Sequence, residues 1–315
     1  MSKFRLFAGC LVGVVLISGC ATTPSGIQRP PKNVSGLASG CGAAAPAVSY
    51  ATAGGRGGDV RLPPNYDPNH SYPLLLSLHP FVLVPSAWET YSGLGDAAAA
   101  RGFVVVSPLG SDPGPRWSVP GGGDYGVDDF DFLDALIDDV AARWCIDRGR
   151  VFAAGLSAGA AMSVGLTCVL TDRIRGIAAS GGSNLTDLCP ASGGAAALIM
   201  HGTDDPIAPV TGSETPTATP LGLHLSDVVA SFASRNGCAV SPTVTQLTTS
   251  VTKSAYVGCG ARTPLVFLEM QGAGHTWAGS GFDPLVQPFF EGIVGPTDRS
   301  ISANDLALDF FESLH

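Results

Sequence analysis

The chain has 315 residues, of which 45% are hydrophobic and only 14% are charged. This composition excludes a disordered polyelectrolyte, because a chain of this length and apolar content can bury a large core. The formal net charge of −9 lacks the basic surplus of a nucleic-acid-binding protein, so no nucleic-acid partner is expected.

The start of the chain is typical of an export signal that ends at a lipid attachment site. A positively charged beginning precedes an apolar stretch over residues 6–17, which is too short for a stable membrane span. The following string Ile17-Ser18-Gly19-Cys20 resembles the bacterial lipobox, in which the cysteine is lipidated and becomes the mature N-terminus. We therefore expect a lipoprotein signal peptide over residues 1–19 and a lipid anchor at Cys20 in a bacterial cell envelope. The alternative is an ordinary signal peptide with an incidental cysteine.

The rest of the chain divides into a tether and one domain. Residues 20–40 are rich in Pro, Ser, Gly and Thr without periodicity, which predicts a flexible tether. No internal repeat or second change of composition follows, so residues 41–315 are expected to form a single domain.

Six cysteines remain after the leader, and an even number in an oxidising compartment predicts three disulfides. One pair would close a Thr/Val-rich excursion over residues 243–257 that could fold as a hairpin. A second would join the ends of two successive helices, and a third would hold the N-terminal segment near the site. The expected pairs are Cys238–Cys259, Cys145–Cys168 and Cys41–Cys189. The chain has no CxxC, HxH or HExxH spacing, so no metal site is expected.

The body of the chain alternates apolar strands with helices. Strands are predicted over residues 73–79, 102–108, 151–155, 174–180, 196–201 and 264–270. Helices are predicted over residues 88–101, 128–144, 158–170, 223–235, 285–293 and 305–314. Continuous apolar strands that alternate with helices predict an α/β fold, with a mostly parallel central sheet and helices on both faces.

One motif in this pattern carries chemistry. The string Gly155-Leu156-Ser157-Ala158-Gly159 is the only GxSxG in the chain. It follows a predicted strand and opens a predicted helix, which is the context of a nucleophile elbow. The glycines leave room for the tight turn, and the helix N-terminus places positive charge near a developing oxyanion. We predict that Ser157 is a catalytic nucleophile; the alternative is an ordinary loop serine.

A serine hydroxyl needs a base, and the base needs an orienting carboxylate. In this type of fold the acid and then the histidine follow the serine along the chain. His275 lies in a glycine-flanked loop after the last core strand, and Asp204 and Asp205 follow the strand that ends near His201. Neighbouring side chains on an extended loop point in opposite directions, so only one of the two acids can face His275.

Two further histidines, His79 and His201, end buried strands. We expect both to be structural imidazoles that are bonded to the backbone.

A set of short motifs within residues 39–293 carries a family resemblance. In chain order these are SGCG at 39–42, RLPPNYD at 61–67, GVDD at 126–129 with Phe132-Leu133, WCID at 144–147, RVF at 150–152, HGT at 201–203 with Asp205, NGC at 236–238 and GHTW at 274–277. Together they resemble the polyhydroxybutyrate depolymerase and feruloyl esterase group, which is close to carbohydrate esterase family 1 of the α/β-hydrolase fold. The resemblance implies an extracellular serine esterase without a cofactor, and the spacing of its acid motif implies that Asp205 is the triad carboxylate.

One departure from the family concerns the oxyanion hole. The family usually has His-Gly after the first core strand, whereas this chain has His79-Pro80-Phe81. Proline has no N–H, so the donor is expected to be the amide of Phe81, with the amide of Ala158 as the second donor. The aromatic residues Trp117, Trp277, Tyr125 and Phe282 are candidates for the substrate cleft, with core packing as the alternative.

We therefore expect a secreted or lipid-anchored monomeric serine carboxylesterase. Its expected substrates are polyhydroxyalkanoate or feruloyl and acetyl esters of plant polysaccharide. Three alternatives stay open at this point: a serine peptidase with the same triad, a polyester hydrolase of the cutinase type, and an inactive surface lipoprotein that binds polysaccharide.

Overall fold

A computed structural model describes residues 38–44, 46, 50–111, 115–119, 128–189, 194–212, 222–260, 263–282 and 284–314. The predicted signal peptide, the predicted lipidation site Cys20, most of the predicted tether and Tyr125 lie outside the described residues.

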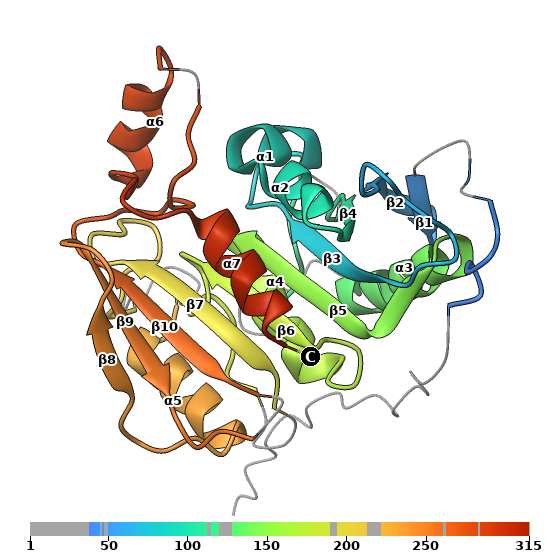
Figure 1. Cartoon of the computed structure of the whole chain (residues 1–315). Helices are drawn as coiled ribbons and strands as arrows, with labels where there is room; N and C mark the ends of the chain where they lie inside the picture. Colours follow the sequence, from blue (N-terminus) through green and yellow to red (C-terminus); the bar gives the residue numbers. More distant parts are fainter. Residues whose placement is uncertain are drawn as a thin grey trace, which may run out of the picture.

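The described residues form one ten-stranded sheet in the order β1-β2-β4-β3-β5-β6-β7-β10-β9-β8 (Figure 1). The six strands from β4 to β10 in this order are parallel, and antiparallel strands flank them on both sides. The strands are β1 (Tyr50–Ala53), β2 (Arg56–Arg61), β3 (Tyr72–Leu78), β4 (Val104–Pro108), β5 (Ile146–Leu156), β6 (Gly176–Ser180), β7 (Ala196–Gly202), β8 (Thr243–Gln246), β9 (Val251–Tyr256) and β10 (Leu265–Met270). The predicted mostly parallel sheet is confirmed.

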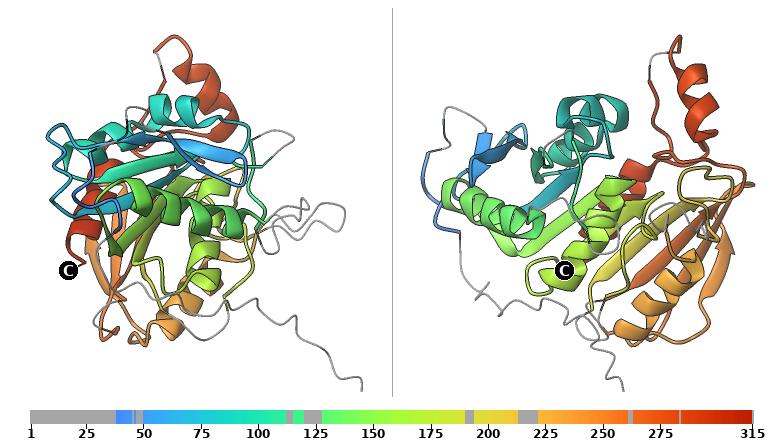
Figure 2. Two further views of the ribbon diagram at one scale, coloured as in Figure 1. Left: turned by 90° about the vertical axis from the view of Figure 1, so that its right-hand side faces the viewer. Right: turned by 180° about the vertical axis from the view of Figure 1, so that it is seen from behind.

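Helices cover both faces of this sheet (Figure 2). Helices α3 (Asp129–Arg143), α4 (Ala158–Val169) and α5 (Leu225–Arg235) contribute buried side chains to one hydrophobic core. Helices α1 (Pro85–Ser92), α2 (Leu94–Ala100) and α7 (Ala303–Glu312) contribute to the core on the opposite face. The remaining helix, α6 (Gln287–Val294), projects beyond the sheet in both Figure 1 and Figure 2. The predicted three-layer α/β arrangement is therefore confirmed.

The helix predicted over residues 88–101 is wrong as one element. The structure has α1 and α2 there, separated by Gly93 at a φ of 63°. Glycine adopts this left-handed conformation at no steric cost, and it ends α1 by donating its N–H to the carbonyl of Glu89.

The three disulfides join Cys41–Cys145, Cys168–Cys189 and Cys238–Cys259. The expected Cys238–Cys259 pair is confirmed, and it lies beside the β8–β9 hairpin that fills the predicted excursion. The expected pairs Cys145–Cys168 and Cys41–Cys189 are wrong.

The reason for the corrected pairing is the course of the N-terminal segment. Gly40 donates its N–H to the carbonyl of Ala141, 3.0 Å away, near the end of α3. A Cβ on Gly40 would lie 2.4 Å from the backbone nitrogen of Trp144. This close approach places Cys41 beside Cys145. Cys168, near the end of α4, therefore forms its disulfide with Cys189 in the loop that follows β6.

None of the helices in the described residues combines the length and the apolar character that crossing a membrane requires.

Candidate active site

Ser157 occupies a strained turn between β5 and α4. Its φ of 58° and ψ of −121° are unusual for a residue with a side chain, and Val82 is the other non-glycine residue with positive φ in the described part of the chain. A Cβ on Gly155 or Gly159 would lie 2.4 or 2.0 Å from the carbonyl oxygen of Leu78. Only glycine fits at these two positions, because the end of β3 packs directly against the turn.

His275 is fixed in the loop that follows β10. Its backbone amide donates to the carbonyl of Val294 over 2.6 Å, and the backbone amide of Gly274 donates to the carbonyl of Pro296 over 2.7 Å. A Cβ on Gly274 would lie 2.2 Å from the oxygen of Val294, so the glycine permits this close contact. The end of α6 and the residues after it therefore set the position of the imidazole.

The Nδ1 atom of His275 lies 2.8 Å from Oδ2 of Asp205. An ionised carboxylate can only accept a hydrogen bond, so this contact places the imidazole proton on Nδ1 and leaves the lone pair on Nε2. The other carboxylate oxygen of Asp205 accepts hydrogen bonds from the amides of Ile207 and Ala208, at 2.8 and 2.7 Å. The carboxylate is thus buried, satisfied and aimed at His275.

Asp204 has a different environment. It is exposed, and its carboxylate accepts a hydrogen bond from the hydroxyl of Thr203. The structure therefore brings Asp205, and not Asp204, into contact with His275.

Ser157 and His275 pack against two consecutive glycines, Gly182 and Gly181 respectively, which belong to none of the sequence motifs. A Cβ on Gly181 would lie 3.2 Å from Nδ1 of His275, and a Cβ on Gly182 would lie 2.7 Å from Cα of Ser157. Among the described residues, no hydrogen bond joins the hydroxyl of Ser157 to the imidazole. The consecutive glycines directly after the predicted strand 174–180 were the available signal for this close packing.

The residues expected to form the oxyanion hole lie at the end of β3 and the start of α4. A Cβ on Gly159 would lie 3.0 Å from the carbonyl oxygen of His79, so the turn after β3 packs on the first turn of α4. In the described residues the amides of Phe81 and Ala158 have no acceptor. Ala158 is the first residue of its helix, where free N–H groups give the helix end a partial positive charge.

His79 is a structural imidazole, as expected from the sequence. Its Nε2 accepts from the amide of Gly110 at 2.9 Å, which requires that Nδ1 donates to the carbonyl of Pro80 at the same distance. Burial lowers the pKa of His79 to about 4, so the ring is neutral at ordinary pH.

The two tryptophans proposed for the substrate cleft are packing residues. Trp117 is 2% exposed, its ring lies 4.9 Å from that of His79, and its Nε1 donates to the carbonyl of His79. Trp277 is completely buried against Trp88 and donates its Nε1 proton to Asn304. Neither ring has a face open to a ligand, so the expectation that they line the cleft is wrong.

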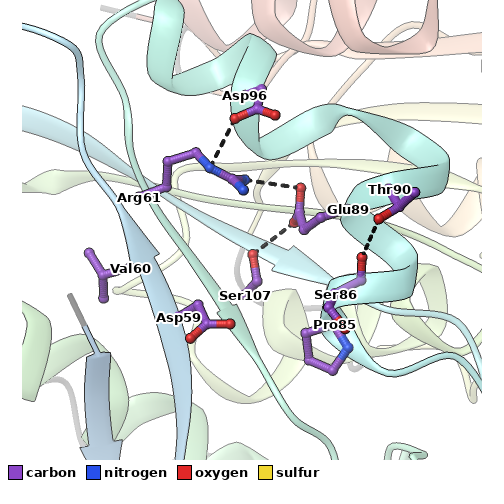
Figure 3. Close-up of a pocket in the computed structure, with 9 residues that line it drawn as sticks. All are labelled: Asp59, Val60, Arg61, Pro85, Ser86, Glu89, Thr90, Asp96 and Ser107. Carbon is purple, nitrogen blue, oxygen red and sulfur yellow. Dashed lines mark hydrogen bonds and ion pairs between the residues drawn. The ribbon is translucent and has the colours of Figure 1, made fainter. Parts of the chain in front are cut away.

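A polar cavity of about 390 Å³ lies between β2, β4 and α1, and Ser157, Asp205 and His275 do not line it (Figure 3). The carboxylate of Glu89 on its wall accepts from the hydroxyl of Ser107 and the amide of Gly95, at 2.7 and 2.8 Å. The carboxylate of Glu89 is therefore already bonded to groups of the protein, including the guanidinium of Arg61. Within the described part of the chain, no cluster of three or more His, Cys, Asp or Glu side chains is placed to hold a metal ion.

Comparison with known proteins identifies esterases among the relatives of this chain. A protein of Nocardia uniformis subsp. tsuyamanensis that is named as an esterase, NocK, is 29% identical over 260 residues, which are 76% of this chain and 73% of that protein. Feruloyl esterase C of Emericella nidulans is 28% identical over 57% of this chain and 61% of that enzyme. Feruloyl esterase D of Neurospora crassa is 28% identical over 57% of this chain and 59% of that enzyme. The match thus spans about three fifths of these feruloyl esterases. No protein-family model matches the chain.

Solved structures show the fold. An acetyl xylan esterase from Aspergillus awamori superposes with a TM-score of 0.54 at 14% identity, over 70% of this chain and 89% of that chain. A thermophilic esterase from Thermogutta terrifontis superposes with a TM-score of 0.52 at 11% identity, over 82% of this chain and 89% of that chain. These likenesses confirm the fold, and the sequence relatives confirm the esterase resemblance that the sequence motifs indicated.

Proposed function

We propose that this chain, a carboxylic ester hydrolase of the α/β-hydrolase fold, cleaves its substrate through an acyl-enzyme formed on Ser157. The observation that carries the proposal is the placement of three groups. A buried His275–Asp205 pair, joined over 2.8 Å, packs on the same glycine pair as a serine in a strained strand-to-helix turn. The three residue types of a Ser-His-Asp mechanism are thus gathered around one pair of consecutive glycines, which supports this mechanism.

The first half of the reaction forms the acyl-enzyme. Nε2 of His275 carries the lone pair, because Nδ1 donates to Asp205, so Nε2 takes the hydroxyl proton as the oxygen of Ser157 attacks the ester carbonyl. The negative charge of Asp205 stabilises the imidazolium that forms. His275 then returns the proton to the leaving alcohol as the ester C–O bond breaks.

The second half releases the acid. Water attacks the acyl carbon while His275 takes one of its protons, and the serine oxygen leaves with that proton. In both halves the negative charge on the carbonyl oxygen needs donors. The amides of Phe81 and Ala158 are the proposed pair, since both lack another acceptor in the described residues and lie at adjacent backbone segments.

The test of this proposal is hydrolysis of para-nitrophenyl acetate by the wild type and by Ser157→Ala. We expect the variant to lose on the order of 10⁴-fold or more in kcat, as nucleophile removal does in serine hydrolases. Ser234→Ala, at an exposed serine of α5, is the matched control and should keep wild-type activity. A Ser157→Ala variant with near wild-type kcat would refute the assignment.

For the substrate, we propose an ester of the class that the relatives' names indicate. Feruloyl esters are favoured by the names of the sequence relatives. Acetyl esters of plant polysaccharide and polyhydroxyalkanoate are the other classes implied by the motif resemblance. Parallel assays with methyl ferulate, para-nitrophenyl acetate to octanoate and a polyhydroxybutyrate film would rank them. Activity only on the film would contradict the feruloyl assignment.

We further propose that the enzyme works outside the cytoplasm as a monomer held by a lipid on Cys20. Three disulfides among the described residues support an oxidising compartment, and the lipobox-like string supports the anchor. The net charge of −9 argues against nucleic-acid binding. Metabolic labelling with palmitate should mark the wild type and not Cys20→Ser, whereas an unlabelled wild type would contradict the anchor.

A further inference from the structure

A second histidine lies beside the proposed triad carboxylate. His201 is the penultimate residue of β7, and its side chain is completely buried. Its Nε2 lies 2.7 Å from the carbonyl oxygen of Ala208 and 3.5 Å from Oδ2 of Asp205. A carbonyl oxygen can only accept, so Nε2 of His201 carries a proton, and this proton faces two acceptors.

We propose that His201 is a positioning residue whose Nε2–H holds the turn Asp205–Ala208 closed and keeps the carboxylate of Asp205 in place for His275. The proposal deepens the proposed function, because it rests on Asp205 as the triad carboxylate.

The geometry of the turn explains why one donor has this effect. Oδ1 of Asp205 is held by the amides of Ile207 and Ala208, and the carbonyl of Ala208 is held by His201. The imidazole thus connects the end of β7 to the far side of the turn. Loss of its donor would free the carbonyl of Ala208, and with it the two amides that orient the carboxylate.

The protonation state of His201 suits this role. Its Nδ1 is buried and has no hydrogen-bond partner in the described residues, so a second proton would be an unsatisfied buried donor. Burial also lowers the pKa of His201. The hydrogen bond to Ala208 and the charge of the Asp205 carboxylate oppose this effect, and the charge of His275 adds to it. A neutral donor orients Asp205 without cancelling the negative charge that stabilises the imidazolium of His275.

The test compares His201→Leu with His201→Gln. Leucine fills similar volume without a donor, whereas the side-chain amide of glutamine can place an N–H near the position of Nε2. We expect His201→Leu to lose on the order of 10²-fold in kcat on para-nitrophenyl acetate with little change in KM, because the carboxylate is misplaced. His201→Gln should recover most of this loss. His224→Leu, at an exposed histidine, is the matched control and should behave as wild type.

A second readout separates positioning from packing. The acid limb of the kcat/KM profile reports the pKa of the free enzyme's catalytic base. This limb should move to lower pH in His201→Leu, since a displaced carboxylate holds the imidazolium of His275 less well, and should return toward the wild-type position in His201→Gln. Equal losses in both variants with an unmoved limb, or wild-type kinetics in His201→Leu, would overturn the proposal.

Two controls keep the result interpretable. If circular dichroism shows that His201→Leu does not fold, the proposal is tested on His201→Gln and the wild type instead. The measurement is then the proton NMR signal of the His275–Asp205 hydrogen bond. The proposal expects the signal in both proteins, and its loss in folded His201→Gln would contradict it. Failure of the proposed function is recognised separately, because Ser157→Ala would then keep wild-type activity.

Discussion

Asp204 and Asp205 are adjacent in the sequence, but their carboxylates have opposite environments. The sequence pattern could place both at the site, and only the family spacing distinguished them. In the structure Asp205 is buried on His275, while Asp204 is exposed and bonded to Thr203. The backbone amides that orient Asp205 belong to the following turn, and the two adjacent acids alone do not indicate which of them accepts from these amides.

This difference predicts different kinetics for two isosteric variants. Asp205→Asn should lose on the order of 10⁴-fold in kcat, because an amide cannot stabilise the imidazolium and permits the wrong tautomer of His275. Asp204→Asn should keep most of the activity, since its carboxylate is exposed and, among the described residues, bonds only to Thr203. Kinetics on para-nitrophenyl acetate with circular dichroism as the folding control test this. An inactive Asp204→Asn beside an active Asp205→Asn would reverse the assignment.

The buried His79 predicts a dependence of stability on pH. Its pKa is lowered from 6.5 to about 4, so the unfolded chain binds the proton first as the pH falls. The free energy of unfolding should therefore fall as the pH is lowered from 6.5 to 4, and His79 should account for at most about 3 kcal/mol of this loss. Above pH 6.5 the contribution of His79 to stability should be complete.

Urea unfolding of wild type and His79→Gln at pH 7 and pH 4.5 measures this contribution. The loss of stability between the two pH values should be smaller in His79→Gln, which has no titrating group at this position. His70→Gln, at an exposed histidine, should show the same loss as wild type. Equal losses in all three proteins would show that His79 does not contribute.

At the level of elements, the sequence predicts the apolar central strands well and the edges poorly. Runs such as 73–79 and 102–108 are continuous and buried on both faces, so their pattern is unambiguous. Strands β1 and β2 were not predicted, because they are short, and β2 contains two consecutive glycines. They form because β2 pairs with β4, which is a long-range contact, and β1 then pairs with β2 as the edge strand.

The nucleophile turn was predictable because its GxSxG string is contiguous in the sequence, and the packing of β3 on this turn yields a test. Gly159→Ala should destabilise the fold by at least about 2 kcal/mol, because the new Cβ would lie 2.0 Å from the backbone oxygen of Leu78. Gly292→Ala is the matched control. It lies in α6 with nothing within 4 Å, and should be neutral or stabilising by up to about 1 kcal/mol. Equal unfolding midpoints for Gly159→Ala and wild type would show that β3 does not pack on the turn as described.

At the scale of the whole molecule, two of the three disulfide pairs could not be predicted from the sequence. The local pair Cys238–Cys259 followed from a recognisable hairpin, but Cys41–Cys145 depends on where the N-terminal segment crosses the end of α3. The hydrophobic periodicity of the sequence does not indicate where this segment crosses the helix. The same holds for the tryptophans, whose burial results from packing between distant segments.

The corrected pairing predicts unequal contributions to stability. Cys41–Cys145 spans 104 residues and Cys238–Cys259 spans 21, so loop-closure entropy makes the first more stabilising by about 1.4 kcal/mol. Thermal unfolding of the two double alanine variants, Cys41→Ala with Cys145→Ala and Cys238→Ala with Cys259→Ala, measures the difference. A larger loss of stability in the Cys238 and Cys259 variant would contradict this ordering.

The central claim is that Ser157 is the nucleophile activated by His275, and covalent labelling tests it most directly. The purified protein is treated with a fluorophosphonate, and the modified residue is located by peptide mass spectrometry. We expect one adduct, on Ser157, that forms rapidly in the wild type, forms much more slowly in His275→Ala and is absent from Ser157→Ala. An adduct on another serine, or a wild type that stays unmodified under conditions where it hydrolyses para-nitrophenyl acetate, would contradict the account.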